Sequence, residues 1–170
     1  MKTRRRVLPG LLLAGLIGAG FLYVVLGWLY PDQDNYTLIE EGLYQGGDVK
    51  KPPRRTRAVL NLCEKKDPYK FSVHRWEPIK DTAPGPDLDW LREMVEFVEE
   101  NRREGRTTFV HCRNGVSRSG LVVVAYLMFE HDWSRDEALE FVRSKRSETR
   151  PNRAFMKLLS AWERELKKQR

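Results

Sequence analysis

A long apolar segment opens the chain. Residues 7–30 contain no charged side chain, and Trp28 and Tyr30 stand at the far end. A helix of about 23 residues rises roughly 35 Å, which is enough to cross a hydrocarbon core of about 30 Å. Glycine is common in membrane spans, and aromatic rings favour the membrane interface. The pattern therefore predicts one transmembrane helix over residues 7–30, an uncleaved anchor that follows a basic tail of residues 1–6.

Two other interpretations of this segment stay open. A cleaved secretory signal would have a shorter apolar region followed by small residues, whereas this segment ends in Gly-Trp-Leu-Tyr-Pro at residues 27–31. An organellar presequence is the second alternative, because the start is rich in arginine and free of acidic residues.

The charges on the two sides of the span predict its orientation. Four basic residues precede it, whereas residues 31–41 hold four acidic residues and no lysine or arginine. Because positive flanks stay in the cytoplasm, we expect a single-pass protein with its folded domain on the non-cytoplasmic side.

The rest of the chain mixes strand-like and helix-like patterns. Strand character is found at residues 38–45, 58–63, 71–79 and 107–110. Apolar residues recur at helical spacing over 87–103 and again after Pro151, and the stretch 119–131 is nearly all apolar, as in a buried helix. Ser134 followed by Glu137 is a capping box that opens a further helix to about residue 145. We predict a linker over 31–37, a folded domain over 38–166 and a basic tail over 167–170. This alternation indicates an α/β fold with a central mixed sheet flanked by helices.

Composition excludes several classes of function. The net charge is +7, but without the four N-terminal cations the chain has 27 basic against 24 acidic residues. No helix rich in arginine and lysine and no zinc spacing accompanies this mild charge, so we expect no nucleic-acid partner. Two cysteines are too few for a disulfide scaffold. The three histidines form no ligand-spaced pair, so we expect no metal site.

One loop carries the chemistry. The sequence His111-Cys112-Arg113-Asn114-Gly115-Val116-Ser117-Arg118-Ser119 lies between an apolar strand and an apolar helix. A loop in this position can point successive backbone N–H groups inward, and the following helix adds its positive end. We therefore predict a phosphate site. Its residues are Arg113, Asn114, Gly115, Val116, Ser117 and Arg118, of which Arg118 can hold two phosphate oxygens through its planar fork.

The same field acts on Cys112. A helix N-terminus beside arginines favours the thiolate, which is the nucleophilic form of cysteine. Attack on phosphorus would give a phosphocysteine that water then cleaves. Ser119 is placed to bond the sulfur and to ease its departure. A lone cysteine is more often a small buried apolar residue, but here cysteine, glycine and arginine occur together in one Cys-x5-Arg loop.

The stretch from His111 to Ser119 resembles the signature of the protein tyrosine phosphatase superfamily, in its small dual-specificity branch. The resemblance covers roughly residues 36–162. Residues 42–47 are similar to the opening strand and turn of that branch, and residues 58–62 are similar to its second core strand. The resemblance implies the dual-specificity phosphatase fold, an activity on phosphorylated proteins and no cofactor.

The resemblance also implies a general acid, on a loop about thirty residues before the cysteine. Asp81 lies in a segment of this kind, after a strand-like stretch, and we predict that it protonates the leaving oxygen. Asp87 and Asp89 are rivals, although Asp87 suits the start of the next helix.

Cys63 has two interpretations. Residues 61–64 resemble a segment of the phosphoinositide 3-phosphatases, in which the cysteine can pair with the nucleophile. That likeness implies Cys63 as a redox partner of Cys112, and a disulfide would protect the thiol and stop activity. The alternative is a buried apolar cysteine at the end of a strand.

Two substrate classes and two other functions stay open. A phosphorylated protein is the first, and a membrane phospholipid of the phosphoinositide or phosphatidylglycerophosphate type is the second. The anchor and the basic loop of residues 50–57 favour the lipid, because such a loop can contact anionic headgroups. The same loop is otherwise a solvated turn. A non-catalytic phosphate-binding membrane module is a third hypothesis, and a sulfurtransferase or arsenate reductase is a fourth.

Overall fold

The strands of the domain form one mixed sheet. The structure is a computed structural model, and it describes residues 35–169. The strands are β1 (Tyr36–Glu40), β2 (Leu43–Gly46), β3 (Thr56–Asn61), β4 (Val73–Trp76) and β5 (Thr107–His111). Their order in the sheet is β1-β2-β5-β3-β4. β1 runs antiparallel to β2, and the other neighbouring pairs are parallel. The predicted α/β class with a mixed central sheet is confirmed.

Residues 35–169 also contain four helices, and side chains cap the starts of three of them. They are α2 (Leu88–Arg103), α3 (Arg118–Glu130), α4 (Arg135–Lys145) and α5 (Arg153–Lys168). Asp87 caps α2 and Asn152 caps α5, because each side chain accepts a backbone N–H of the first turn. α4 opens with the predicted capping box, in which Ser134 and Glu137 satisfy each other's backbone groups.

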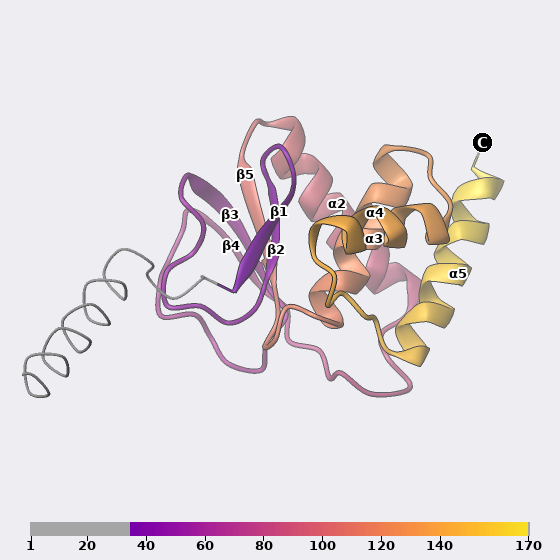
Figure 1. Ribbon diagram of the computed structural model, residues 1–170, viewed down its shortest axis with the longest axis horizontal. Helices are drawn as coiled ribbons and strands as arrows, with labels where there is room; N and C mark the ends of the chain where they lie inside the picture. Colours follow the sequence, from indigo (N-terminus) through magenta and orange to yellow (C-terminus); the bar gives the residue numbers. More distant parts are fainter. Residues whose placement is uncertain (1–34, 170) are drawn as a thin grey trace, which may run out of the picture. The chain divides into compact units, whose positions relative to one another are not determined.

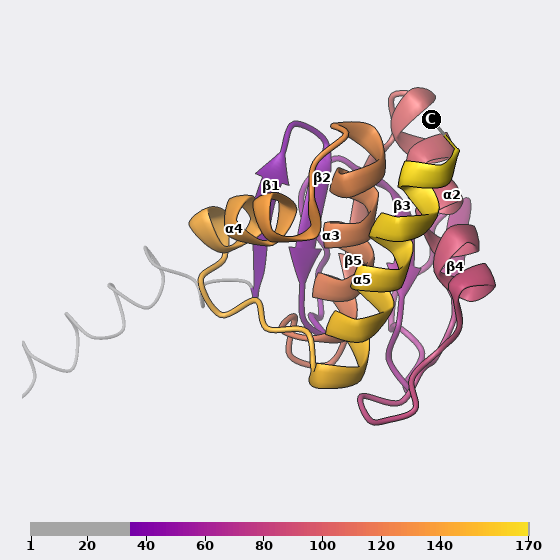
Figure 2. The ribbon, with the colours of Figure 1, turned by 90° about the vertical axis from the view of Figure 1, so that its right-hand side faces the viewer.

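The helices gather on one face of the sheet (Figure 1). Leu43, Leu60 and Val110 point from three strands into the same apolar cluster as the helices. α3 is buried along almost its whole length, from Arg118 to Met128, because it lies between the sheet and α5 (Figure 2). The Trp162 indole of α5 donates a hydrogen bond of 3.1 Å to the Ala125 carbonyl of α3. This packing fixes the start of α3 at the carboxyl end of β5.

Two predicted strands differ from the observed ones. The stretch 38–45 is a hairpin rather than one strand, because Gly42 adopts a left-handed φ of 75° and reverses the chain between β1 and β2. The stretch 71–79 is shorter, since only Val73–Trp76 pairs with β3, and Pro78 has no N–H to extend the ladder.

The first strand begins earlier than the predicted stretch of residues 38–45. β1 begins at Tyr36 rather than Leu38, because the Tyr36 ring packs edge-on against Tyr44 at 5.9 Å. The predicted span over residues 7–30 lies outside the described residues. Within residues 35–169, no helix is both long and apolar enough to cross a membrane.

Candidate active site

A loop of residues 112–117 joins the central strand β5 to the buried helix α3. Ser117 is the first residue before α3, so the loop lies at the positive end of that helix. Both neighbouring elements are buried in the core. The loop therefore starts and ends on rigid supports, which is the arrangement that a precise site requires.

The carbonyl groups of residues 113–116 are all bonded to donors outside the loop. The donors are the Asp48 amide to Arg113 (3.0 Å), the Arg146 guanidinium to Asn114 (3.3 Å) and Gly115 (2.8 Å), the Gln45 side chain to Gly115 (3.0 Å) and the Arg150 amide to Val116 (2.9 Å). In a trans peptide, the C=O of one residue and the N–H of the next point in opposite directions. The N–H groups of residues 114–117 are therefore directed to the inner side, where they form a nest for an anion.

Gly115 is required by the shape of this loop. Its φ is 71°, in the left-handed region. A Cβ added there would lie 2.5 Å from the Gly46 carbonyl carbon and 2.6 Å from a guanidinium nitrogen of Arg146. Any side chain would therefore push the loop away from the sheet and from the arginine that holds it.

Cys112 lies at the base of the nest. Its side chain is buried, and its amide donates to the Gly46 carbonyl at 3.1 Å. The Cys112 Sγ lies 3.4 Å from the Ser119 Oγ, which is also buried. The predicted nucleophile and the predicted hydroxyl are thus brought into direct contact.

Arg118 is held by one nitrogen and leaves the other side of its fork unused. Nη1 donates to the Ile79 carbonyl at 3.0 Å and lies 2.9 Å from the Glu64 carboxylate. Nε makes no hydrogen bond to any part of residues 35–169, although it is buried. Burial alone would lower the pKa of Arg118, but the bond to Glu64 and the negative charge of Cys112 raise it above its ordinary value. The guanidinium therefore stays charged.

Asp81 lies beside the loop. Its Oδ1 accepts hydrogen bonds from the Ser117 hydroxyl at 2.6 Å and the Asn152 amide at 2.8 Å. Its Oδ2 is 3.9 Å from the Arg118 Nε. The side chain is 38% exposed, so it contacts both the loop and solvent. Its rivals lie elsewhere, since Asp87 caps α2 and Asp89 pairs with Arg92.

Some predicted residues contribute only their backbone. The side chains of Arg113 and Asn114 are exposed, whereas their carbonyls hold the loop in place. Sequence reasoning missed Gln45, Arg146 and Asn152, which support the loop or Asp81 from distant parts of the chain. Only the fold brings them to the loop, and no local pattern marks them.

A buried polar chain runs behind Cys112 and was also missed. The Asp67 carboxylate, only 1% exposed, lies 3.1 Å from His111 Nε2 and 2.9 Å from His74 Nε2. An ionised carboxylate only accepts hydrogen bonds, so both nitrogens carry protons. On its other side, the His111 Nδ1 lies 3.9 Å from the Cys63 Sγ. Asp67 thus fixes the orientation of the residue that precedes the nucleophile.

Neither Cys63 nor Cys112 forms a disulfide bond within residues 35–169. Burial, followed by the charge of Cys112, raises the pKa of Cys63 to about 12. The Cys63 thiol therefore stays protonated at neutral pH, and in this form it is not a nucleophile.

Asp67→Asn should destabilise the domain in a pH-dependent way. Burial would raise the pKa of Asp67, but the bonds from His111 and His74 lower it below its ordinary value of 3.8. Because the pKa of this carboxyl is lower in the folded state than in the unfolded state, its ionised form stabilises the fold at pH values above the ordinary pKa. This stabilisation is lost as the pH falls through the pKa of the folded state. We expect urea unfolding at pH 7 to show a loss of about 1–3 kcal/mol.

The difference between wild type and Asp67→Asn should then shrink as the pH falls below 3.8. Asp136→Asn is the matched control, because its side chain is 77% exposed, and we expect little change from it. A loss of the same size at pH 3 and pH 7 would show that the charge of Asp67 contributes nothing.

Comparison with known proteins gives consistent matches. The dual specificity phosphatase catalytic domain matches residues 54–165. Dual specificity protein phosphatase 1 of Arabidopsis thaliana is 32% identical over 148 residues, which cover 81% of this chain and 73% of that protein. Dual specificity protein phosphatase 16 of Homo sapiens is 36% identical over 109 residues, covering 64% of this chain but only 16% of that protein. A mouse dual specificity phosphatase complexed with zinc tungstate has a TM-score of 0.75 at 25% identity, covering 82% of this chain and 93% of that one.

Proposed function

The chain belongs to the dual specificity phosphatase family, and on that basis we propose that it hydrolyses phosphomonoesters of proteins through a phosphocysteine intermediate. One observation carries the proposal. The outward carbonyls of residues 113–116 turn the amides of residues 114–117 to the inner side of the loop, which begins at the buried Cys112 and leads into the buried Arg118. A dianionic phosphate group satisfies both the amides and the guanidinium.

In the first step, the Cys112 thiolate attacks phosphorus and the bond from phosphorus to the ester oxygen breaks. The negative charge moves from sulfur to the equatorial oxygens and the leaving oxygen. The amides and Arg118 stabilise the equatorial charge, and this positioning supplies most of the catalysis in phosphoryl transfer. In the second step, water attacks the phosphocysteine and gives a proton to the Asp81 carboxylate, which restores the acid. The sulfur leaves as a thiolate that accepts a bond from the Ser119 hydroxyl, 3.4 Å away.

Asp81 is the proposed general acid for the leaving oxygen. Asp81→Asn keeps the size and one acceptor for Ser117, but it removes the proton to be donated. We expect the rate on a phosphotyrosine peptide to fall by about a hundredfold or more. The rate on a nitrophenyl phosphate should fall far less, because its leaving group needs no proton. Steady-state kinetics on the two substrates measure this difference.

Asp89→Asn is the control for that experiment, because Asp89 is 85% exposed and pairs only with Arg92 among residues 35–169. It should change neither rate. Equal losses on both substrates in Asp81→Asn would give Asp81 a structural role, through Ser117 and Asn152, and would place the acid elsewhere.

A phospholipid headgroup is the alternative substrate. It rests on the apolar segment of residues 7–30 and on the basic loop of residues 50–57. Phosphate release from phosphotyrosine and phosphothreonine peptides should exceed release from vesicles containing phosphoinositide or phosphatidylglycerophosphate. The reverse order would replace the protein substrate by a lipid. No turnover of either substrate, with phosphate still bound, would instead support the non-catalytic module.

We also propose that residues 7–30 anchor the chain in a membrane, with the folded domain on the non-cytoplasmic side. The uncharged segment and the basic tail before it support this proposal. Protease treatment of sealed membranes should leave a C-terminal tag protected on the non-cytoplasmic side. Digestion of the tag from the cytoplasmic side would reverse the orientation, and recovery of the protein in the soluble fraction would remove the anchor.

Cys63 is the proposed redox partner of Cys112. The support is that both thiols are buried and that the Cys63 sulfur lies 3.9 Å from Nδ1 of His111, the residue before Cys112. Peroxide would oxidise Cys112 to the sulfenic acid, which removes the negative charge that helps to raise the Cys63 pKa. Cys63 would then lose its proton, attack the Cys112 sulfur and displace hydroxide, which leaves with that proton as water. Mass spectrometry of the oxidised protein should find this bond. Over-oxidation of Cys112 to the sulfinic acid without a disulfide would exclude it.

A further inference from the structure

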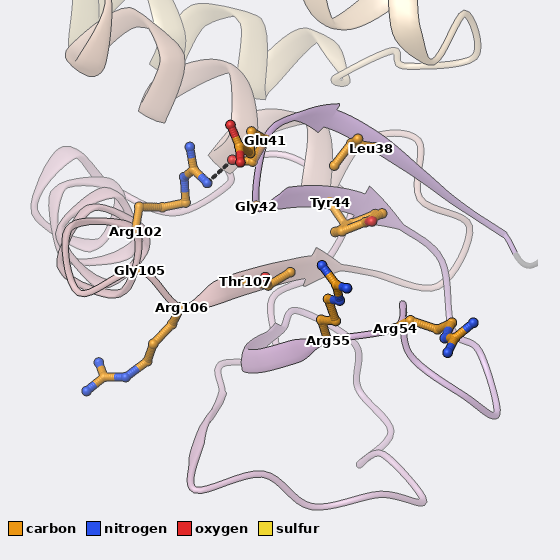
Figure 3. Close-up of a pocket in the computed structure, with 10 residues that line it drawn as sticks. All are labelled: Leu38, Glu41, Gly42, Tyr44, Arg54, Arg55, Arg102, Gly105, Arg106 and Thr107. Carbon is orange, nitrogen blue, oxygen red and sulfur yellow. Dashed lines mark hydrogen bonds between the residues drawn. The ribbon is translucent and has the colours of Figure 1, made fainter.

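A hollow of about 620 Å³ lies on the face of the sheet that carries no helix (Figure 3). Leu38 of β1 and Tyr44 of β2 face it side by side, because they are partners in the strand register. The hollow lies at the amino ends of β2, β3 and β5, where it is lined by Gly42, Arg55 and Thr107. The phosphate loop lies at the opposite, carboxyl ends of these strands.

The hollow is open because the connection that crosses this face is short and irregular. Residues 47–55 lead from β2 to β3, and both strands run parallel to β5. Parallel strands are usually joined by a helix, but residues 47–55 contain none. Pro52 and Pro53 interrupt this connection and lack the N–H groups of a helix interior. Leu38 consequently remains 48% exposed, which is unusual for a strand leucine of this domain.

Two of the four arginines around the hollow are already paired. Arg102 bonds to the Glu40 carboxylate at 3.0 Å and to the Glu41 carbonyl. Arg106 donates to the Asn101 side chain at 3.0 Å and pairs with Glu104. These pairs use the guanidiniums within the domain, so they add little net charge to the hollow.

Arg54 and Arg55 are different. Neither makes a hydrogen bond or an ion pair with residues 35–169. They are the central residues of a turn that is closed by the Thr56 amide and hydroxyl, which donate to the Pro53 carbonyl at 3.2 and 2.7 Å. The two side chains therefore project from a fixed turn.

The backbone of this turn adds a second observation. Arg55 has a φ of 68°, in the left-handed region, where a turn normally carries glycine or asparagine. An arginine at this position keeps a conformational cost that glycine would remove. Strain of this kind is commonly retained where the side chain has a function.

We propose that the hollow is a docking site for an acidic peptide segment of a protein partner. Carboxylates of the peptide pair with Arg54 and Arg55, whose planar forks match carboxylate geometry. An apolar side chain between those carboxylates covers Leu38 and Tyr44. The concave shape favours an inserted peptide over the flat surface of a bilayer. Selection of protein substrates through this site rests on the proposed phosphatase function. Binding of the peptide does not depend on that function.

The position of the hollow sets a length requirement. β2 has four residues, and at about 3.3 Å per residue it separates the hollow from the phosphate loop by roughly 13 Å. An acidic segment and a phosphorylated residue of one substrate can bind together only if several residues connect them. When they do, the second contact raises the effective concentration of the phosphorylated residue at Cys112.

The test uses the full chain and a fluorescent, unphosphorylated peptide in which glutamates flank one leucine. Arg54→Glu/Arg55→Glu should weaken binding by at least about tenfold in fluorescence anisotropy. Lys50→Glu/Lys51→Glu is the matched control, because it makes the same charge change on exposed residues of the same connection that do not line the hollow. This control should bind nearly as well as the wild type.

Nitrophenyl phosphate hydrolysis should be unchanged in both double variants, so a failure of docking and a failure of catalysis are distinguishable. Equal weakening in both variants would reduce the effect to general charge attraction and overturn the site. Absence of peptide binding by the wild type would overturn it as well. Binding to anionic vesicles that is lost only in Arg54→Glu/Arg55→Glu, without peptide binding, would assign the hollow to lipid instead.

Discussion

Cys112→Ser should abolish turnover while the protein still binds phosphate. The serine hydroxyl is not ionised at neutral pH, so the site loses its nucleophile. The amides of residues 114–117 and the Arg118 fork do not depend on the sulfur. We expect the hydrolysis of nitrophenyl phosphate to fall by about a thousandfold or more, and titration calorimetry should show phosphate affinity close to that of the wild type.

Cys63→Ala is the matched control for this result. The Cys63 thiol is buried, protonated and directed at His111, so its loss should leave most of the hydrolytic rate. A Cys112→Ser variant that kept an appreciable rate would contradict the phosphocysteine mechanism. If Cys63→Ala were instead the inactive variant, the nucleophile would be assigned to the wrong cysteine.

Arg118→Lys should be the second severe loss, although the charge is kept. Arginine uses Nη1 on the Ile79 carbonyl and Glu64 and still presents Nε and Nη2 as a fork. A single ammonium cannot hold the protein and two phosphate oxygens in the same geometry. We expect kcat to fall by about 10²- to 10³-fold, as for the loss of one oxyanion donor, and phosphate binding should weaken.

Arg113→Lys provides the comparison within the same loop. Its guanidinium is exposed, and only its carbonyl takes part in holding the loop. Because lysine keeps that carbonyl and the charge, the variant should retain nearly full activity in the same assay. Nearly full activity in both variants would mean that general positive charge, rather than the fork of Arg118, binds the phosphate.

Patterns over neighbouring residues predicted most of the fold. The helical spacing of residues 87–103 and the capping box at Ser134 predicted two helices. Their predicted ends, 87–103 and 134–145, differ by at most one residue from the observed ends. The hairpin of β1 and β2 was not predicted, because one glycine with a positive φ interrupts a stretch that otherwise has strand composition. The open sheet face beside the connection of residues 47–55 was not predicted either. A proline-rich connection shows that a helix is absent, but it does not show which face of the sheet is then left uncovered.

The site also contains residues that local sequence patterns predicted and residues that only the fold brings together. The spacing of Cys112, Gly115 and Arg118 is local, so their grouping was predictable from the chain alone. The residues that hold the loop are not local, because Gln45 and Arg146 reach Gly115 from positions 70 and 31 residues away. The buried carboxylate of Asp67 was hidden for another reason. An Asp-Pro pair normally indicates an exposed turn, and only tertiary packing places this carboxylate between two imidazoles.

Asn35, at the beginning of the described domain, takes part in holding the loop. Its side-chain oxygen accepts from Arg146 at 2.5 Å, and its carbonyl accepts the Gly47 amide at 2.7 Å. Arg146 in turn bonds two carbonyls of the loop. Shortening the chain from its N-terminus is therefore harmless to catalysis only if the cut leaves Asn35 in place, and a domain trimmed to Leu38 should fold around a loosened, poorly active loop.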